Sequence, residues 1–167
     1  MVFLLCCAAL ALAACSSLSA RHLEARAWKP LDRQELVMKF WRFEFTGVPA
    51  GARYGLKGVA YPLAENLPGW AGNLESLTLT AYLRDRNGNI LASDVKEYLP
   101  MTVDPKKGID FDFFLDPGKA SHSGLSVSFG YRAMFTSKAK AGRSTGAVAA
   151  IPDGEVFFAE EGALIKY

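Results

Sequence analysis

The sequence predicts an all-β fold, an antiparallel immunoglobulin-like β-sandwich of about seven or eight strands over residues 35–167. Three observations lead to this prediction. Apolar and polar residues alternate with a period of two from Leu36 onward, as in strands with one buried face. Turn-forming residues recur about every ten positions. The chain is rich in aromatic residues, glycine and proline, and contains no internal repeat.

The first half of the domain contains three expected strands and one hairpin turn. Residues 37–45 and the weaker run 53–61 alternate in polarity, as do residues 76–84. The first of these strands should bury Val37, Trp41, Phe43 and Phe45. The segment 85–89 contains Asn-Gly, which predicts a tight primed turn because both residues accept a positive φ.

The second half continues the pattern. The return strand 90–99 should be irregular near Ser93 and Asp94, where the alternation slips. Strand 109–115 lies between two Pro- and Gly-containing turns, 104–108 and 116–118. The clearest strand is 125–135, with one face in the core and the other, which includes Ser128, mostly in solvent. Two weaker strands, 147–151 and 155–159, are joined through Pro152-Asp153-Gly154.

An apolar run that begins at Val2 ends in Leu12-Ala13-Ala14-Cys15. This ending resembles the lipobox of bacterial lipoproteins. The resemblance implies diacylglyceryl transfer to the Cys15 thiol, cleavage before Cys15 and acylation of the new amino terminus. Residues 1–14 would then be a signal peptide, residues 15–34 a tether and residues 35–167 the sandwich. The run lacks the basic residues that usually precede the apolar part of a secretory signal.

Two other interpretations of this end of the chain stay open. Ala11-Leu12-Ala13 also fits the A-x-A cleavage site of an ordinary secretory signal. The other alternative is that the run is a buried N-terminal segment of the folded protein. A transmembrane helix needs about 20 apolar residues, and this run stops at Ser16 and Ser17. By resemblance to Gram-negative sorting, Ser16 after the cysteine implies an outer-membrane location that faces the periplasm.

The composition excludes several classes of function. Cys6 and Cys7 leave with the signal and Cys15 carries lipid, so the domain has no thiol for a disulfide or a metal. The net charge of +2 is too small to indicate nucleic acid as a partner. Neither a P-loop nor a dinucleotide-binding G-x-G-x-x-G is present, and we expect no cofactor. The membrane, reached through lipid on Cys15, and an envelope protein are the expected partners.

One hairpin carries a second resemblance. The segment Leu79–Leu91 reads L-T-A-Y-L-R-D-R-N-G-N-I-L. It is similar to the strand and hairpin of many bacterial envelope sandwiches, including the family named after its F-x-L-Y-D motif. This resemblance implies an envelope sandwich and transfers no catalytic residue.

Catalysis and metal binding have little support. The only histidines are His22 and His122, and Ser121 and His122 are neighbours whose side chains point to opposite faces of an extended segment. A hydrolase is therefore the third-ranked function. Asp110 and Asp112 share a strand face and could supply part of the ligand shell of a calcium ion. The alternative is that this face of the sheet is simply exposed to solvent and binds no metal.

Two loops are candidates for partner contact. Leu67 and Trp70 flank Pro68-Gly69, and an exposed aromatic on a stiff turn makes a good anchor, unless Trp70 closes one end of the sandwich. The second loop spans residues 137–146 and is suited to phosphate or anionic glycan, or is simply solvated. Its basic residues are Lys138, Lys140 and Arg143.

The sequence therefore predicts a lipid-anchored protein of the cell envelope. Its sandwich should act as a non-enzymatic binding or assembly module. The second-ranked function is a carrier of a small apolar ligand, in a pocket lined by Trp28, Trp41 and the Phe-rich strands.

Overall fold

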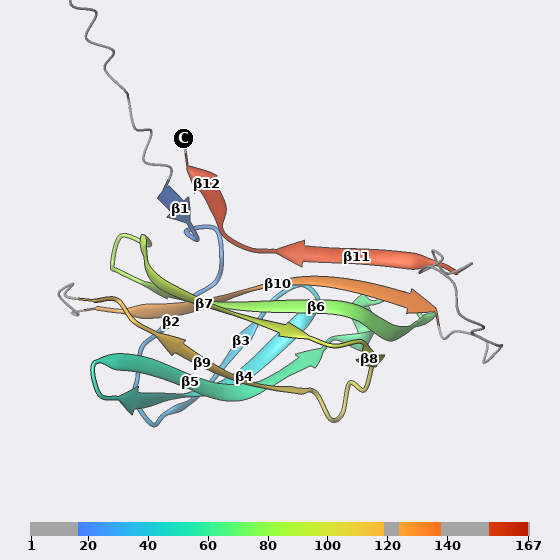
Figure 1. Ribbon diagram of the computed structural model, residues 1–167, viewed down its shortest axis with the longest axis horizontal. Coiled ribbons are helices and arrows are strands. Elements are labelled where there is room, and N and C mark those ends of the chain that lie inside the picture. Colours follow the sequence, from blue (N-terminus) through green and yellow to red (C-terminus); the bar gives the residue numbers. More distant parts are fainter. Residues whose placement is uncertain (1–16, 119–123, 138–153, 167) are drawn as a thin grey trace, which may run out of the picture.

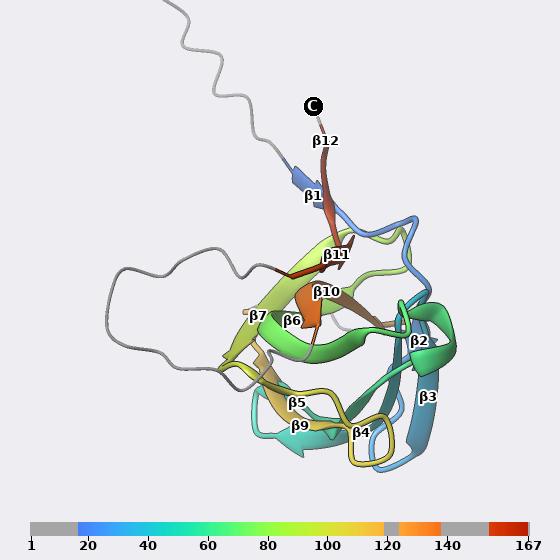
Figure 2. The same ribbon diagram turned by 90° about the vertical axis from the view of Figure 1, so that its right-hand side faces the viewer.

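The computed structural model describes residues 17–118, 124–137 and 154–166. It is an all-β sandwich of two antiparallel layers (Figure 1), which lie one above the other in the view along the long axis (Figure 2). In this part of the chain, no helix is long and apolar enough to span a bilayer. The elements are β1 Ser17–Ser19, β2 Arg26–Ala27, β3 Arg33–Val37, β4 Trp41–Ala50, β5 Arg53–Pro62, a 3₁₀ helix Ala64–Asn66, β6 Ala71–Arg84, β7 Ile90–Tyr98, β8 Met101–Thr102, β9 Ile109–Leu115, β10 Ser126–Ser137, β11 Val156–Glu161 and β12 Leu164–Lys166.

The two layers are a larger and a smaller sheet. The six-stranded sheet has the order β11-β10-β6-β7, with β2 beside β10 and β8 beside β6, and the four-stranded sheet has the order β3-β4-β5-β9. The prediction of an all-β antiparallel sandwich is confirmed, with more strands in the two sheets than expected. Strands β1 and β12 form a separate two-stranded ribbon.

Phenylalanine rings from both sheets fill the space between the layers. Phe43 of β4 stacks on Phe129 of β10 with ring centroids 4.4 Å apart. Phe111 of β9 lies 5.5 Å from the same Phe129 ring. The apolar face predicted for residues 125–135 is buried throughout, which confirms the register expected for β10. Its members are Leu125, Val127, Phe129, Tyr131, Ala133 and Phe135.

The single strand expected over residues 37–45 is wrong. β3 and β4 form a hairpin, and residues 38–40 make the turn. Val37 pairs with Arg42 on the outer face and is 42% exposed, while Leu36 is buried. The chain reverses direction inside an apolar run. Counting the alternation of apolar and polar residues across this turn, as if it were one strand, assigns Val37 to the wrong face.

The hairpin at residues 85–89 is present, but its turn is not primed. Gly88 has a φ of +78°, and in the described residues Leu31 is the only residue other than glycine with a positive φ. The Gly88 amide donates to the Asp85 carbonyl at 3.0 Å. This is a type I turn followed by a left-handed glycine. The Asp85 carboxylate stabilises it by accepting hydrogen bonds from the amides of Asn87 and Asn89, both at 2.8 Å.

The irregularity in β7 is displaced from the predicted position near Ser93 and Asp94. The pairing of β6 with β7 shifts between Leu83 and Arg84, whose partners are Ala92 and Ile90. The extra residue is therefore Leu91, which is a β-bulge directly after the turn.

Residues 17–34, expected to form a tether, belong to the domain. The Trp28 amide donates to the Leu125 carbonyl at 2.9 Å, next to β10 of the larger sheet. The Leu31 amide donates to the Gly47 carbonyl in β4 of the smaller sheet, at 2.8 Å. The segment therefore ties the two layers together and forms no helix.

The guanidinium of Arg84 is buried at the end of β6. Arg84 is 6% exposed, and its Nη1 donates to Ser128 Oγ at 2.7 Å and to the Leu23 carbonyl at 3.1 Å. Its Nε has no hydrogen-bond partner among the described residues. Burial lowers the pKa of Arg84 from its ordinary value. Ser128 is fully buried, so its predicted place in solvent is wrong: the arginine and the N-terminal segment cover it.

We predict that Ser128→Ala lowers the free energy of unfolding by about 1–3 kcal/mol, because a buried charged donor loses its acceptor. Urea denaturation followed by tryptophan fluorescence measures this loss. Ser76→Ala, at an exposed position of β6, is the matched control and should change stability by less than about 0.5 kcal/mol.

The same substitution in an Arg84→Met background separates this cause from simple packing. Once the charge is gone, Ser128→Ala should cost much less, because the two residues act as one hydrogen-bonded pair. An equal cost in both backgrounds would contradict the role assigned to Arg84.

Candidate functional site

An open groove lies between the β3–β4 turn, the 3₁₀ helix and strand β11. It is shallow and broadly open to solvent, with a volume of about 540 Å³. Segments far apart in the sequence meet there, one from each layer and one from the connection between β5 and β6. The lining residues are Lys39, Phe40, Glu65, Asn66, Leu67, Pro68 and Phe157.

Hydrogen bonds fix the walls of the groove. The Leu63 amide donates to the Phe40 carbonyl at 2.9 Å. The Asn66 side-chain amide donates to the Lys39 carbonyl at 2.6 Å. These bonds hold the 3₁₀ helix against the β3–β4 turn, so the groove is formed before any partner arrives.

The floor of the groove is aromatic. Phe40 and Phe157 make an edge-to-face contact with ring centroids 5.3 Å apart. Phe157 also lies 6.3 Å from Phe135 of the core, which fixes the floor to the sandwich. The rim carries opposite charges: Glu65 is exposed, and the exposed Lys39 places its ammonium 5.1 Å from the centre of the Phe40 ring. An apolar floor with a charged rim is typical of a surface that binds a partner.

Strand β11 is an edge strand beside this groove. Within the described residues it pairs with β10 alone (Figure 1). Phe157 faces the groove, while its neighbour Phe158 is 71% exposed. The free backbone groups of an edge strand are a template for pairing with another chain. Groove and edge therefore form one continuous surface.

Of the two residues predicted for partner contact in the loop before β6, one lines the groove. Leu67 lines the groove and packs against the core. Trp70 is half-buried, directly before β6, and is not among the groove-lining residues. Four further predicted residues lie outside the described residues: Cys15, Lys138, Lys140 and Arg143.

Phe40 and Phe157 were missed as site residues from the sequence. Their alternation identified them only as members of strands. Their juxtaposition depends on how β11 passes the β3–β4 turn, and residue spacing carries no signal for that contact.

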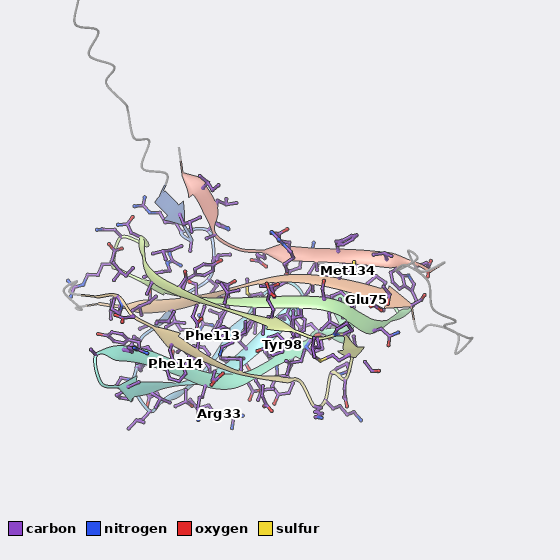
Figure 3. All side chains as sticks on the ribbon, in the orientation of Figure 1. Arg33, Glu75, Tyr98, Phe113, Phe114 and Met134 are labelled. Atoms are coloured by element: carbon purple, nitrogen blue, oxygen red, sulfur yellow. The ribbon has the colours of Figure 1, made fainter. Side chains whose placement is uncertain are left out.

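The acidic pair considered for calcium closes the opposite edge of the sandwich. Lys96 Nζ of β7 lies 3.2 Å from Asp112 Oδ1 of β9. The Tyr98 hydroxyl, which extends from β7 toward β9 (Figure 3), donates to the Asp110 carbonyl at 3.1 Å. No group of three or more metal-binding side chains occurs in the described part of the chain. The Asp112 charge is already balanced, which argues against the calcium hypothesis.

A third contact joins the same two strands. Asp94 Oδ2 accepts a hydrogen bond from the Phe114 amide of β9 at 2.9 Å. A carboxylate of one sheet thus occupies a backbone donor of the other. This edge is closed by polar contacts, whereas the edge with the groove is apolar and open.

Comparison of the chain with protein-family models, curated proteins and solved structures finds no significant match.

The environment of Tyr98 makes the closed edge sensitive to alkaline pH. Burial, and then the charges of Asp112 and Asp110, raise the pKa of Tyr98 to about 12. A tyrosine in the unfolded chain titrates near about 10. Between these values the folded state binds more protons than the unfolded state, so stability falls as pH rises.

We predict that Tyr98→Phe makes the free energy of unfolding fall less steeply between about pH 10 and about pH 12 than in the wild type. Urea denaturation across this range measures the slope. At pH values where Tyr98 stays protonated in the folded wild type, the lost hydrogen bond to Asp110 lowers the curve of the variant by a constant amount. Parallel curves for variant and wild type would contradict the raised pKa.

Proposed function

We propose that the protein is a lipid-anchored cell-envelope protein whose sandwich is a non-enzymatic binding or assembly module. The observation that carries the proposal is the continuous surface of groove and β11 edge. The groove provides an apolar floor on Phe40 and Phe157, and the edge provides backbone groups that pair with no other strand of the described chain.

This combination fits an extended segment of a partner protein. A segment that adds to a sheet edge gains main-chain hydrogen bonds, and its alternate side chains enter neighbouring pockets. The groove beside Phe157 is such a pocket, and the exposed Phe158 offers an aromatic contact on the other face of β11. The charges of Lys39 and Glu65 at the rim add selectivity.

The lipid anchor rests on the L-A-A-C sequence ending at Cys15. One acyl chain gives marginal, reversible binding, whereas the two or three chains of a mature lipoprotein anchor a domain stably. Ser16 after the cysteine favours the outer membrane with the domain in the periplasm, if the cell has two membranes. The partner would then be another protein of the envelope.

The packing favours a binding module over a carrier of a small apolar ligand. Rings from both sheets fill the interior around Phe129. An apolar pocket at the end near Trp41 and Met101 has about 150 Å³, less than the roughly 300–1,000 Å³ of small-molecule sites. The hollow beside Trp28 reaches about 360 Å³, but it lies open at the surface and exposed residues such as Arg53 form much of its wall.

A hydrolase has less support. His22 is exposed, and Ser121 and His122 lie outside the described residues. Glu160, which lines a polar cleft of about 240 Å³ on the outer face of the larger sheet, is paired with Arg132 at 2.9 Å. Because Arg132 occupies Glu160 Oε1, this oxygen is not available to accept a proton from a water.

We predict that Cys15→Ala gives an unprocessed or soluble product. Metabolic labelling with a palmitate analogue should mark the wild type and not the variant, because the thioether forms only on that thiol. Ser16→Ala is the control and should keep the label. Equal labelling of wild type and Cys15→Ala would disprove the anchor.

We also predict that Phe158→Lys weakens capture of the co-purifying partner by about tenfold or more, because it removes an aromatic contact and charges an edge strand. The melting temperature should hardly change, since Phe158 is 71% exposed. The capture is measured by quantitative pull-down from solubilised membranes.

The matched control for this variant is Leu99→Lys. Leu99 is 84% exposed, lies between β7 and β8 and is not among the groove-lining residues. This substitution introduces the same positive charge in place of another large, exposed apolar side chain. Equal loss of capture in the two variants would disprove the role of the groove and edge.

A further inference from the structure

The ribbon of β1 and β12 stands apart from both layers. The two strands pair with each other and belong to neither sheet. Figures 1 and 2 show the ribbon rising from the side of the larger sheet. One isolated bridge, Ser19 to Asn89, connects it to the turn between β6 and β7.

The ribbon exposes apolar side chains. Leu18 and Ile165 lie directly opposite each other, so their side chains share one face. Leu18 is 49% exposed and Ile165 56%, and Leu164 on the other face is 60% exposed. A two-stranded ribbon is at best marginally stable in water. An apolar cover over the Leu18–Ile165 face would stabilise it.

The position of Cys15 indicates what this cover is. Strand β1 begins at Ser17, two residues after Cys15. Two residues of extended chain span at most about 7 Å. The acyl chains on Cys15 would therefore be attached within about 7 Å of the start of β1. No tether separates the lipid from the ribbon in the sequence.

The charge beside the ribbon is compatible with lipid headgroups. Arg21 is exposed and follows β1 by two residues, where it contacts the β6–β7 turn through Asn89. The turn adds the exposed Arg86 and one carboxylate, Asp85. Exposed guanidinium groups next to an apolar face suit the phosphate layer above the acyl chains.

We infer that the Leu18–Ile165 face of the ribbon inserts into the boundary between headgroups and acyl chains of a phospholipid bilayer, beside the lipid on Cys15. The inference rests on the proposed lipid anchor. It adds a second membrane contact, which fixes how the domain is oriented on the bilayer. The end of the larger sheet at the β6–β7 turn, from which the ribbon rises, then lies nearest the membrane.

The test uses the full lipidated protein in vesicles of phosphatidylcholine and phosphatidylglycerol. Once Cys15 carries lipid and Cys6 and Cys7 have left with the signal, an added cysteine is the only free thiol. An environment-sensitive fluorophore is attached at Ile165→Cys and, as a control, at Val37→Cys. Val37 is 42% exposed on the outer face of the smaller sheet.

We expect iodide in the water to quench the label at position 165 at least about threefold less than the label at position 37, because that label lies below the headgroups. Lipids with brominated acyl chains should quench only the label at position 165. Adding Leu18→Asp should abolish both differences while the protein still floats with the vesicles and keeps its melting temperature.

Three outcomes overturn the inference, and they differ from one another. Protein that floats while both labels respond equally to iodide keeps the anchor and loses the ribbon contact. A label at position 165 that is shielded from iodide but insensitive to brominated lipid points to a second copy of the chain as the cover. Protein that does not float disproves the lipid anchor, and the ribbon contact with it.

Discussion

The fold depends on the packing of rings around Phe129. Phe43 stacks on this ring at 4.4 Å, Phe45 approaches it at 5.1 Å and Phe111 at 5.5 Å, so three rings from two strands, β4 and β9, meet at one side chain of β10. Because side chains alternate along a strand, this contact sets the inward face of β10, and a slip by one residue would reverse every position of it. The outward placement of Ser128, and its burial by Arg84, follow from that register.

The two edges of the sandwich are closed by different chemistry, and this difference gives the domain a binding side. On one edge, β7 and β9 exchange an ion pair, a hydroxyl contact and a carboxylate-to-amide bond. Water competes for these polar contacts, but together they occupy the edges of β7 and β9. On the other edge Phe40 meets Phe157, and β11 leaves its outer side unpaired among the described residues. A partner segment gains both apolar contact and hydrogen bonds only at this second edge.

The sequence was sufficient wherever the determining contacts are local. The faces of β9 and β10 follow from alternation, and the turns at Asp104 and Asp116 follow from carboxylates that accept amide hydrogen bonds two residues along the chain. Prediction from the sequence failed where contacts between distant segments determine the structure. Val37 was misplaced because the chain reverses within an apolar run. Leu67 was identified, but the groove it lines was not, since no local pattern reports that its walls meet β11.

The pairing of β1 with β12 brings the first described strand against the last. Contacts between residues so far apart in sequence form late, because the loop that joins them must close first. A chain that is synthesised or exported from its amino end cannot complete this ribbon until residue 166 has emerged. The ribbon can therefore form only after the rest of the described chain is available, and a chain truncated before β12 leaves β1 without the strand with which it pairs.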